Sequence, residues 1–176
     1  MNINDVISIE DIYLKILHSE DIHDTYINSL NDPKVNQFLV TVKSTFQTYS
    51  TVLEFINLNL MSTKTYFFGI WHKESNNKII GTIKLDQHTD DISNIGICLF
   101  DQNFWNKKIG TTAISIISKW AIKKKIAKKI VAGVYLENKA SMKAFSNAGY
   151  KLIRIDSCKY LLDNLPTPVA FLEYGN

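Results

Sequence analysis

The spacing of apolar side chains changes along the chain, and each change marks a predicted element. Residues 11–17 alternate apolar and polar side chains, which is the period of a half-buried strand. Residues 19–32 begin with Ser-Glu-Asp, which we interpret as a helix start signal, and residues 48–61 carry apolar positions at helical spacing. The first third of the chain is therefore predicted to form one strand and two helices.

The middle of the chain has the pattern of an antiparallel meander. Residues 66–73, 78–88 and 92–100 are rich in β-branched and aromatic side chains, and short turn-forming segments separate them. A helix over 110–125, a strand over 129–136, a helix over 139–147 and strands over 150–156 and 168–174 follow. The predicted order β-α-α-β-β-β-α-β-α-β-β is an α+β fold, with a mixed, mostly antiparallel central sheet flanked by helices.

Composition narrows the classes of protein to which this element order can belong. The chain has 176 residues, 45% of them hydrophobic, and no repeat or linker, so a single domain spanning residues 1–176 is expected. A net charge of +3 does not indicate nucleic acid as a partner. Cys98 and Cys158 lack metal-ligand spacing, which argues against a disulfide framework or a bound metal. With no apolar window of about 18 residues and no cleavable leader pattern, we expect a cytoplasmic protein without a membrane partner.

The segment 103–113, Asn-Phe-Trp-Asn-Lys-Lys-Ile-Gly-Thr-Thr-Ala, is the first candidate binding feature. It joins a predicted strand to a predicted helix through a glycine and two lysines. The first amides of a helix lack intrahelical partners and lie at the positive end of the helix dipole, so such a turn can hold phosphate. Taken alone, the same pattern also fits a plain connection between a strand and a helix.

A second segment, residues 137–152, follows the next predicted strand. Asn138 stands at a helix-cap position, Ser141 and Phe145 follow one turn apart, and Gly149 closes the helix. Structural roles as a cap, a core residue and a helix end would explain each residue. They do not explain why two such segments occur at this separation.

The element order and these two segments resemble the GNAT superfamily of acyl-CoA-dependent N-acyltransferases, nearest to the branch of the ribosomal-protein alanine acetyltransferases. The resemblance covers nearly the whole chain. The acyl-CoA loop of the family, Gln/Arg-x-x-Gly-x-Gly/Ala, falls on residues 105–110, where Trp105 replaces Gln/Arg and Lys108 replaces the first glycine. Because the family binds pyrophosphate mostly through backbone amides, these departures weaken the signature more than the function.

The resemblance implies acetyl-CoA as co-substrate, no metal, and a strand before the loop that bulges and splays from the next strand. Lys107 and Lys108 would flank the pyrophosphate, whereas the six lysines between residues 119 and 129 are explained by the dipole at the end of the helix. Cys98 is interpreted as a packed strand residue and not as a nucleophile. The implied cofactor-binding residues are Ile97, Cys98, Leu99, Trp105, Asn106, Lys107, Lys108, Ile109, Gly110, Thr111, Asn138 and Phe145.

Acyl transfer to an amine also needs an acid for the leaving thiolate and a route for the amine proton. Many family members have a tyrosine acid where Phe145 stands here, so Ser141, which matches the serine proposed as acid in the ribosomal branch, is the candidate. Family members often carry a glutamate base at the position of Asn94. Since Asn94 cannot accept a proton, His88, Asp86 or solvent must take this role.

The family resemblance implies an acceptor site between the two early helices and the segment before the last strand. The missing strong base favours a weakly basic amine, because an α-amino or amino-sugar group needs less deprotonation than a lysine side chain. The predicted function is acetyl transfer to a primary amine of a small molecule, such as a nucleotide-linked amino sugar. A protein N-terminal acetyltransferase and a non-catalytic acyl-CoA-binding sensor are the alternatives, and a homodimer is one assembly that we consider.

Overall fold

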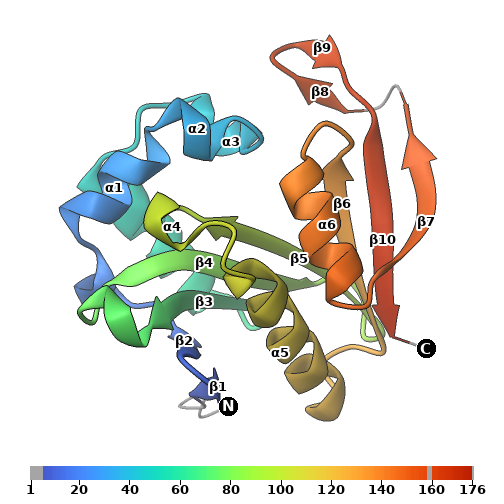
Figure 1. Cartoon of the computed structure of the whole chain (residues 1–176), viewed down its shortest axis with the longest axis horizontal. Helices are drawn as coiled ribbons and strands as arrows, with labels where there is room; N and C mark the ends of the chain where they lie inside the picture. Colours follow the sequence, from blue (N-terminus) through green and yellow to red (C-terminus); the bar gives the residue numbers. More distant parts are fainter. Residues whose placement is uncertain (1–5, 158–159, 176) are drawn as a thin grey trace.

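Eight strands form the central sheet of the computed structural model, which describes residues 6–157 and 160–175 (Figure 1). They are β1 (Ile7–Ile9), β2 (Ile12–Ile16), β3 (Thr65–His72), β4 (Ile79–Gln87), β5 (Ile92–Leu99), β6 (Lys129–Tyr135), β7 (Lys151–Asp156) and β10 (Val169–Gly175). Their order in the sheet is β1-β2-β3-β4-β5-β6-β10-β7, and only the β5–β6 pair is parallel among these described strands. A separate hairpin consists of β8 (Leu161–Leu162) and β9 (Leu165–Pro166).

Helices cover both faces of the sheet, as Figure 1 shows. One face carries α5 (Ile109–Lys123) and α6 (Lys139–Asn147). The chain before β3 forms α1 (Asp24–Leu30), α2 (Pro33–Asn36), α3 (Val40–Lys43) and α4 (Tyr49–Met61), of which α1 and α4 pack on the opposite face. Short 3-10 turns are η1 (Ser19–Asp21), η2 (Lys73–Ser75) and η3 (Gln102–Phe104).

Alternation of side chains along the strands divides the core into two clusters. On the face of α5 and α6, the buried cluster includes Phe68, Ile83 and Ile117. On the face that we call the α4 face, the second cluster includes Phe67 and Trp71. Because the two clusters lie on opposite sides of β3 and β4, these strands are buried on both faces and form the rigid centre of the fold.

The sheet opens between β5 and β6. These two strands pair only where residues Ile92, Ser93 and Asn94 face Lys129, Ile130 and Val131. Beyond Asn94, β5 pairs only with β4, and β6 pairs only with β10. The two strands therefore separate, as the family resemblance predicts for the strand before the acyl-CoA loop, and we call the space between their backbones the slot. The predicted bulge in β5 is not seen, because its register with β4 is unbroken from Ser93 to Leu99.

The predicted fold class, an α+β mixed sheet flanked by helices, is confirmed, and most predicted elements end within two residues of the observed ones. The predictions missed β1, the short helices α2 and α3, and the β8–β9 hairpin. Cys158 lies outside the described residues.

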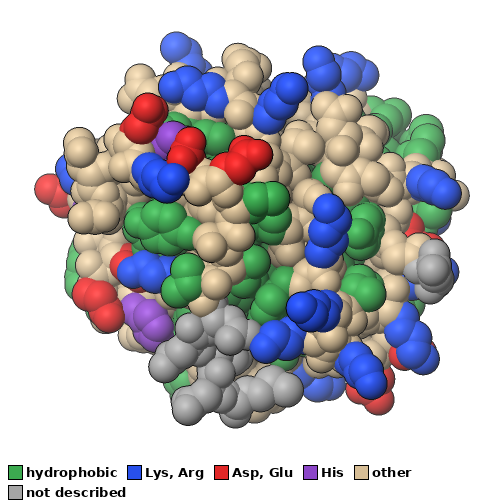
Figure 2. All heavy atoms as spheres, turned by 60° about the horizontal axis from the view of Figure 1, so that its bottom comes forward, with side chains coloured by type: hydrophobic (Ala, Val, Ile, Leu, Met, Phe, Trp, Pro, Cys, Tyr) green, Lys and Arg blue, Asp and Glu red, His purple; other side chains and the backbone are tan. Residues whose placement is uncertain are grey.

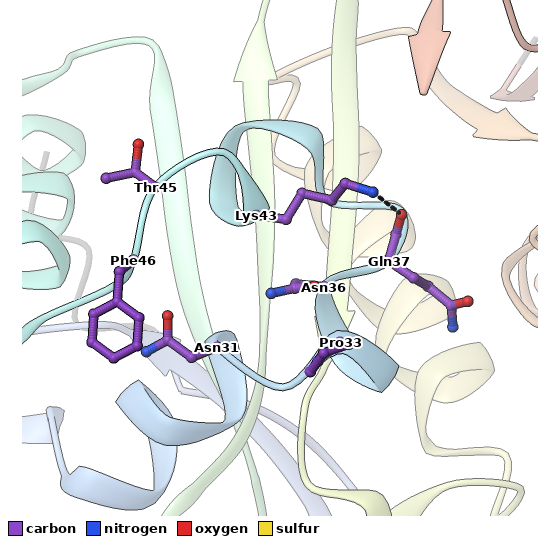
Figure 3. A pocket seen from close by; sticks show the side chains of 7 residues that line it. All are labelled: Asn31, Pro33, Asn36, Gln37, Lys43, Thr45 and Phe46. Atoms are coloured by element: carbon purple, nitrogen blue, oxygen red, sulfur yellow. Dashed lines mark hydrogen bonds between the residues drawn. The ribbon is translucent and has the colours of Figure 1, made fainter. Parts of the chain in front are cut away.

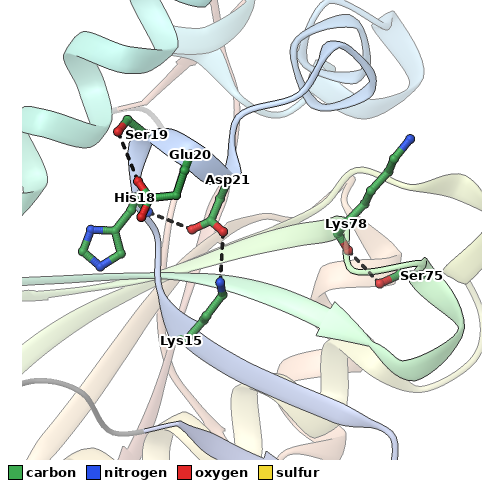
Figure 4. Close-up of polar contacts among 7 residues, drawn as sticks. All are labelled: Lys15, His18, Ser19, Glu20, Asp21, Ser75 and Lys78. Atoms are coloured by element: carbon green, nitrogen blue, oxygen red, sulfur yellow. Dashed lines mark hydrogen bonds and ion pairs between the residues drawn. The ribbon is translucent and has the colours of Figure 1, made fainter.

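The predicted start of the first helix at residue 19 is wrong. There the Ser-Glu-Asp segment forms only η1, in which the Asp21 carboxylate accepts a hydrogen bond from the His18 amide and pairs with Lys15, both at 3.0 Å (Figure 4). The helix begins instead after His23, whose Nδ1 accepts a hydrogen bond from the Tyr26 amide at 3.1 Å. A histidine took the capping role that sequence preference gives to serine or aspartate.

Candidate functional site

The loop before α5 leaves the first turn of a long helix without a cap. Asn106 and Lys108 adopt left-handed backbone angles, with φ of 60° and 63°, and turn the chain into the helix. Lys108 is the N-cap residue, but its side chain makes no capping hydrogen bond, and the first turn holds no acidic residue. The amides at Ile109, Gly110 and Thr111 therefore lie at the positive end of a 15-residue helix without a side-chain acceptor from the cap.

Trp105 and Phe104 hold this loop against the sheet. The Trp105 indole donates a hydrogen bond from Nε1 to the Leu99 carbonyl at 2.7 Å. Phe104 is buried, and the Lys107 ammonium lies 5.3 Å from the centre of its ring. Trp105, which departs from the family signature, thus ties the loop to the end of β5 and occupies one of the Leu99 backbone groups that was predicted to face the cofactor.

Gly110 has open space around it. A Cβ atom added at this glycine would meet only one heavy atom outside its own helix, Ile97 Cδ1, at 4.0 Å. The packing of the chain itself therefore does not require a glycine here. A ligand that approaches the α5 backbone closely is one reason for a glycine at this position.

Lysines at the other end of α5 are partly neutralised by neighbouring carboxylates. Lys128 pairs with Asp91, and Lys129 pairs with Glu173, each at 2.9 Å. On the face shown in Figure 2, basic side chains are spread among acidic and uncharged ones. The lysine-rich stretch therefore belongs to the local surface of the fold, whereas Lys107 and Lys108 belong to the loop before α5.

Side chains at the end of β5 point alternately to the two faces of the sheet. Ile97 and Leu99 pack against the cluster under α5, and Cys98 packs against the cluster under α4. Burial raises the pKa of the Cys98 thiol to about 12, so the thiol stays protonated at neutral pH. This environment fits a packed strand residue and not a thiolate nucleophile.

At the start of helix α6, the side chains of Asn138 and Ser141 are partly accessible, whereas Phe145 further along the helix is buried. The Asn138 side-chain oxygen accepts a hydrogen bond from the Ser141 amide at 3.0 Å, so Asn138 is the cap of this helix. Ser141 is half-buried, and its hydroxyl has no hydrogen-bond partner among the described residues. Phe145 is only 2% exposed and packs edge-to-face on Tyr150, with ring centres 5.0 Å apart. Its ring therefore lies in the core, and its role as a cofactor contact stays a prediction.

Asp86 lies in a polar row on the α4 face of the sheet. The register of the strands places Thr65, Asp86 and Asn94 side by side on β3, β4 and β5. The Asp86 carboxylate accepts a hydrogen bond from the Thr65 hydroxyl at 3.0 Å and pairs with the Lys84 ammonium at 2.9 Å. In the register of the strands, Lys84 on β4 stands opposite Gly96 on β5, and a Cβ atom added at Gly96 would meet no heavy atom within 4 Å. The Asp86 carboxylate, which Thr65 and Lys84 hold in place, thus lies near open space beside β5.

His88, the other predicted base, is not part of this row. It lies beyond the last residue of β4, its side chain is exposed, and its amide donates to the Ile92 carbonyl at 2.8 Å. Asp86, in contrast, stands directly opposite Asn94, the position that holds the family glutamate. The register therefore places Asp86 beside Asn94 and leaves His88 in the turn.

A hollow of about 440 Å³ lies among the short helices before α4 (Figure 3). The Phe46 ring forms part of its wall and is 74% exposed. Asn31 holds the segment in place, because its side-chain oxygen accepts from the Gln47 amide and its Nδ2 donates to the Gln47 carbonyl, both at 2.8 Å. The lining residues are Asn31, Pro33, Asn36, Gln37, Lys43, Thr45 and Phe46.

Contacts between distant segments bridge the wide end of the slot. Phe38, between α2 and α3, stacks on Tyr135 at the end of β6, with ring centres 6.2 Å apart. Lys43 forms an ion pair with Asp163 in the turn of the β8–β9 hairpin. The Tyr135 hydroxyl donates to the Leu161 carbonyl of the same hairpin at 2.8 Å. Sequence reasoning named neither Phe38 nor Lys43, because no local pattern indicates their partners.

Residues 6–157 and 160–175 form neither a cluster of metal ligands nor a helix that could cross a membrane. No three His, Cys, Asp or Glu side chains in these ranges are grouped so that they could hold a metal ion. In the same residues, no helix combines the length and apolar character that a membrane crossing requires.

Both the sequence and the fold of this chain are similar to those of known proteins. Residues 11–151 match the family described as the acetyltransferase (GNAT) domain. No curated protein matches the sequence. A GNAT-family acetyltransferase from Bacillus anthracis superposes with a TM-score of 0.83 at 16% identity, over 97% of this chain and 98% of that one.

Two further solved structures show the same fold. The microcin C7 self-immunity acetyltransferase, in complex with acetyl-CoA and AMP, gives a TM-score of 0.78 at 19% identity, over 96% and 94% of the two chains. The ribosomal-protein-S5-alanine acetyltransferase of Vibrio fischeri gives 0.80 at 16% identity, over 98% and 97%.

Proposed function

Since the chain belongs to the GNAT family of acetyltransferases, we propose that it transfers the acetyl group of acetyl-CoA to a primary amine of a small molecule, such as a nucleotide-linked amino sugar. The opened β5–β6 pair is the observation that carries this proposal. It gives a slot with an uncapped helix N-terminus on one side and a held carboxylate on the other.

The residues on the α5 side of the slot suit a pyrophosphate-containing cofactor. The uncapped first turn of α5, the absence of acidic residues in that turn and the open space at Gly110 all favour a polyanion close to the backbone. We assign the pyrophosphate to the amides of residues 109–111 with Lys107 and Lys108, and the pantetheine arm to the β5 backbone and Asn138. Acetyl-CoA, when bound, supplies the acetyl group as a thioester.

Two side chains of the protein are assigned to move protons. Ser141 Oγ, free of other hydrogen bonds among the described residues, donates a proton on the α6 side of the slot. The Asp86 carboxylate accepts a proton from the acceptor nitrogen, directly or through one water, on the α4 side. Neither group is a strong base, so the proposed acceptor is an amine that is partly neutral near pH 8.

The size of the acceptor is inferred from the segments that bridge the slot. The Phe38–Tyr135 stack and the Lys43–Asp163 pair connect α2 and α3 to the far side of the opening. The adjacent hollow of about 440 Å³ lies within the size range of small-molecule sites. These features support a compact acceptor, and the AMP in the similar microcin C7 self-immunity enzyme makes a nucleotide-containing amine a suitable first choice.

The experiment is a panel of acceptors at fixed acetyl-CoA. Nucleotide-linked amino sugars, N-terminal peptides of ribosomal proteins and spermidine would be compared by release of free thiol and by mass spectrometry of the product. We expect the amino sugars to be acetylated with the highest kcat/KM. Preference for the peptides would replace the proposal by a protein N-terminal acetyltransferase. If acetyl-CoA raises Tm but no amine is acetylated, the protein is a sensor.

A further inference from the structure

A chain of hydrogen bonds on the α4 face ends at the Asp86 carboxylate. The Ser62 hydroxyl donates to the Thr65 hydroxyl, and the Thr65 hydroxyl donates to Asp86 Oδ1, both at 3.0 Å. The second carboxylate oxygen, Oδ2, pairs with Lys84 Nζ at 2.9 Å. Each oxygen of Asp86 is therefore held by a different partner, and the carboxylate plane is fixed from two sides.

These partners come from the end of α4 and from strands β3 and β4, which meet on the α4 face of the sheet. Ser62 follows the last residue of α4, Thr65 begins β3, and Lys84 and Asp86 lie on β4. Directly opposite Asp86 is Asn94, the last residue of β5 that pairs with β6. Side chains at directly opposite positions lie about 5 Å apart at Cβ, so the carboxylate adjoins the point where the slot begins.

These contacts are too weak to contribute much to the stability of the fold. The Lys84 and Asp86 side chains are 31% and 42% exposed, and ion pairs of that exposure contribute between zero and about 1 kcal/mol. Lys84 also lies 5.5 Å from the centre of the Phe55 ring, a second weak contact. The contacts add little to the stability of the fold, but they fix both oxygens of Asp86. Their main effect is therefore on the orientation of its carboxylate.

We propose that Thr65 and Lys84 are positioning residues that hold the Asp86 carboxylate toward the acceptor nitrogen. This inference rests on the proposed function, in which Asp86 takes the proton of the acceptor amine. Thr65 fixes one oxygen, and Lys84 holds the other. Together they fix both oxygens of Asp86 on β4, one pleat along the strand from the open space at Gly96 on β5. Neither residue touches substrate.

The test compares three removals with conservative replacements. Asp86→Asn removes the carboxylate, Thr65→Val removes the hydroxyl at nearly constant shape, and Lys84→Met removes the charge at nearly constant length. Thr65→Ser and Lys84→Arg restore the respective donor. Lys73→Met, in the exposed Lys73–Asp11 pair at 2.7 Å, is the matched control for loss of a surface ion pair.

We expect Asp86→Asn to lower kcat about a hundredfold and Thr65→Val and Lys84→Met about tenfold, since a positioned base contributes roughly 100-fold or more. The KM for acetyl-CoA and the rise in Tm with acetyl-CoA should not change. Thr65→Ser and Lys84→Arg should recover most of the rate. The loss should also grow with the basicity of the acceptor amine, which a purely structural role of these residues would not produce.

The outcomes separate the inference from the function on which it rests. If Asp86→Asn is impaired but Thr65→Val and Lys84→Met keep the wild-type kcat, the positioning role is wrong and the proposed base stands. If Asp86→Asn keeps full activity, both the base and the positioning role are wrong, whereas acetyl transfer itself stands. If Thr65→Val lowers Tm by many degrees, the comparison of Lys84→Met with Lys84→Arg decides the question.

Discussion

The two sides of the slot differ in the groups that form them, which are backbone groups on one side and side chains on the other. On the side of α5, the proposed cofactor contacts are mostly backbone groups carried by elements of 8 and 15 residues. On the opposite side, the hollow and its bridge are made mostly of side chains in and around α2 and α3, with four residues each, and in the turn between β8 and β9, with two residues each. Nearly any residue can supply a backbone amide. The first side can therefore accept Trp105 and Lys108 at signature positions, whereas the second depends on which side chain stands at each position.

This contrast predicts that substitutions will affect different kinetic constants. Changes in the loop before α5 should alter the affinity for acetyl-CoA and leave the acceptor constants alone. Changes around the hollow should do the reverse. A substitution at Ser141, which is proposed to act on the leaving group, should alter neither affinity and only the rate.

Among the substitutions that test this contrast, Ser141→Ala should have the largest effect, and the effect should be on the rate. We expect kcat to fall about tenfold to a hundredfold, with little change in the affinity for acetyl-CoA, which is the pattern of an interaction made in the transition state. Ser146→Ala, at an exposed position of the same helix, is the control. A kcat for Ser141→Ala equal to that of the control would assign the acid to water.

Gly110 provides a test in which stability and affinity should move in opposite directions. Gly110→Ala meets no clash and removes a glycine from a helix, so the chain should become more stable by up to about 0.5–1 kcal/mol. Gly110→Val should weaken acetyl-CoA binding about tenfold, because the side chain fills the space next to the helix amides. Calorimetry and thermal unfolding measure both effects. Wild-type affinity in the valine variant would mean that the loop is only a connection.

Lys108→Glu should have a smaller effect on the same side. Replacing a cation by an anion at a helix N-terminus that holds a polyanion should cost about 1 kcal/mol, close to a fivefold loss of affinity. The loss should shrink as salt is added. Lys119→Glu, also exposed on α5, changes the net charge equally and should leave the affinity near the wild-type value.

Substitutions in the bridge should affect only the acceptor. Phe38→Ala removes the stack on Tyr135, and Lys43→Ala removes the ion pair with Asp163. We expect the acceptor KM to change about twofold to fivefold and the acetyl-CoA KM to stay constant, since exposed contacts of this kind are weak. Lower KM values for long peptides in these variants would show that the bridge excludes them.

The smallest expected effect is a pH dependence on the acceptor side. Burial lowers the pKa of His23, with Lys78 acting in the same direction and Asp24 and Asp101 opposing it. The unfolded chain therefore takes up a proton first as the pH falls, so the stability that His23 contributes above its ordinary pKa of about 6.5 is lost at lower pH. Protonation also converts Nδ1 from an acceptor to a donor and breaks the α1 cap. Hydrogen exchange, corrected for intrinsic rates, should show α1 loosening before α5 between pH 7.5 and 5.5, and His23→Asn should remove the difference.

The same contrast explains what could be predicted from the sequence. Helix α6 and the Thr48 cap of α4 follow local rules, and their predicted bounds agree with the structure to within a residue. The β8–β9 hairpin carried a usable signal, because Asp163 and Asn164 both adopt positive φ, as tight hairpin turns require. The position of Asp86 opposite Asn94 could have been counted back from the turn between β4 and β5. The Phe38–Tyr135 and Lys43–Asp163 contacts join residues about 100 positions apart, and local periodicity contains no information about them.

The two ends of the slot differ greatly in the free energy that holds them together. At one end, a ladder of three residue pairs continues the sheet, and separating it would require unfolding of the core around it. At the other end, one aromatic stack and one ion pair each contribute about 1 kcal/mol or less. Two such contacts hold the wide end of the slot much more weakly than the strand ladder holds the narrow end. The wide end is therefore the end of the slot that can separate at the lower cost in free energy, and we expect an acceptor to enter there.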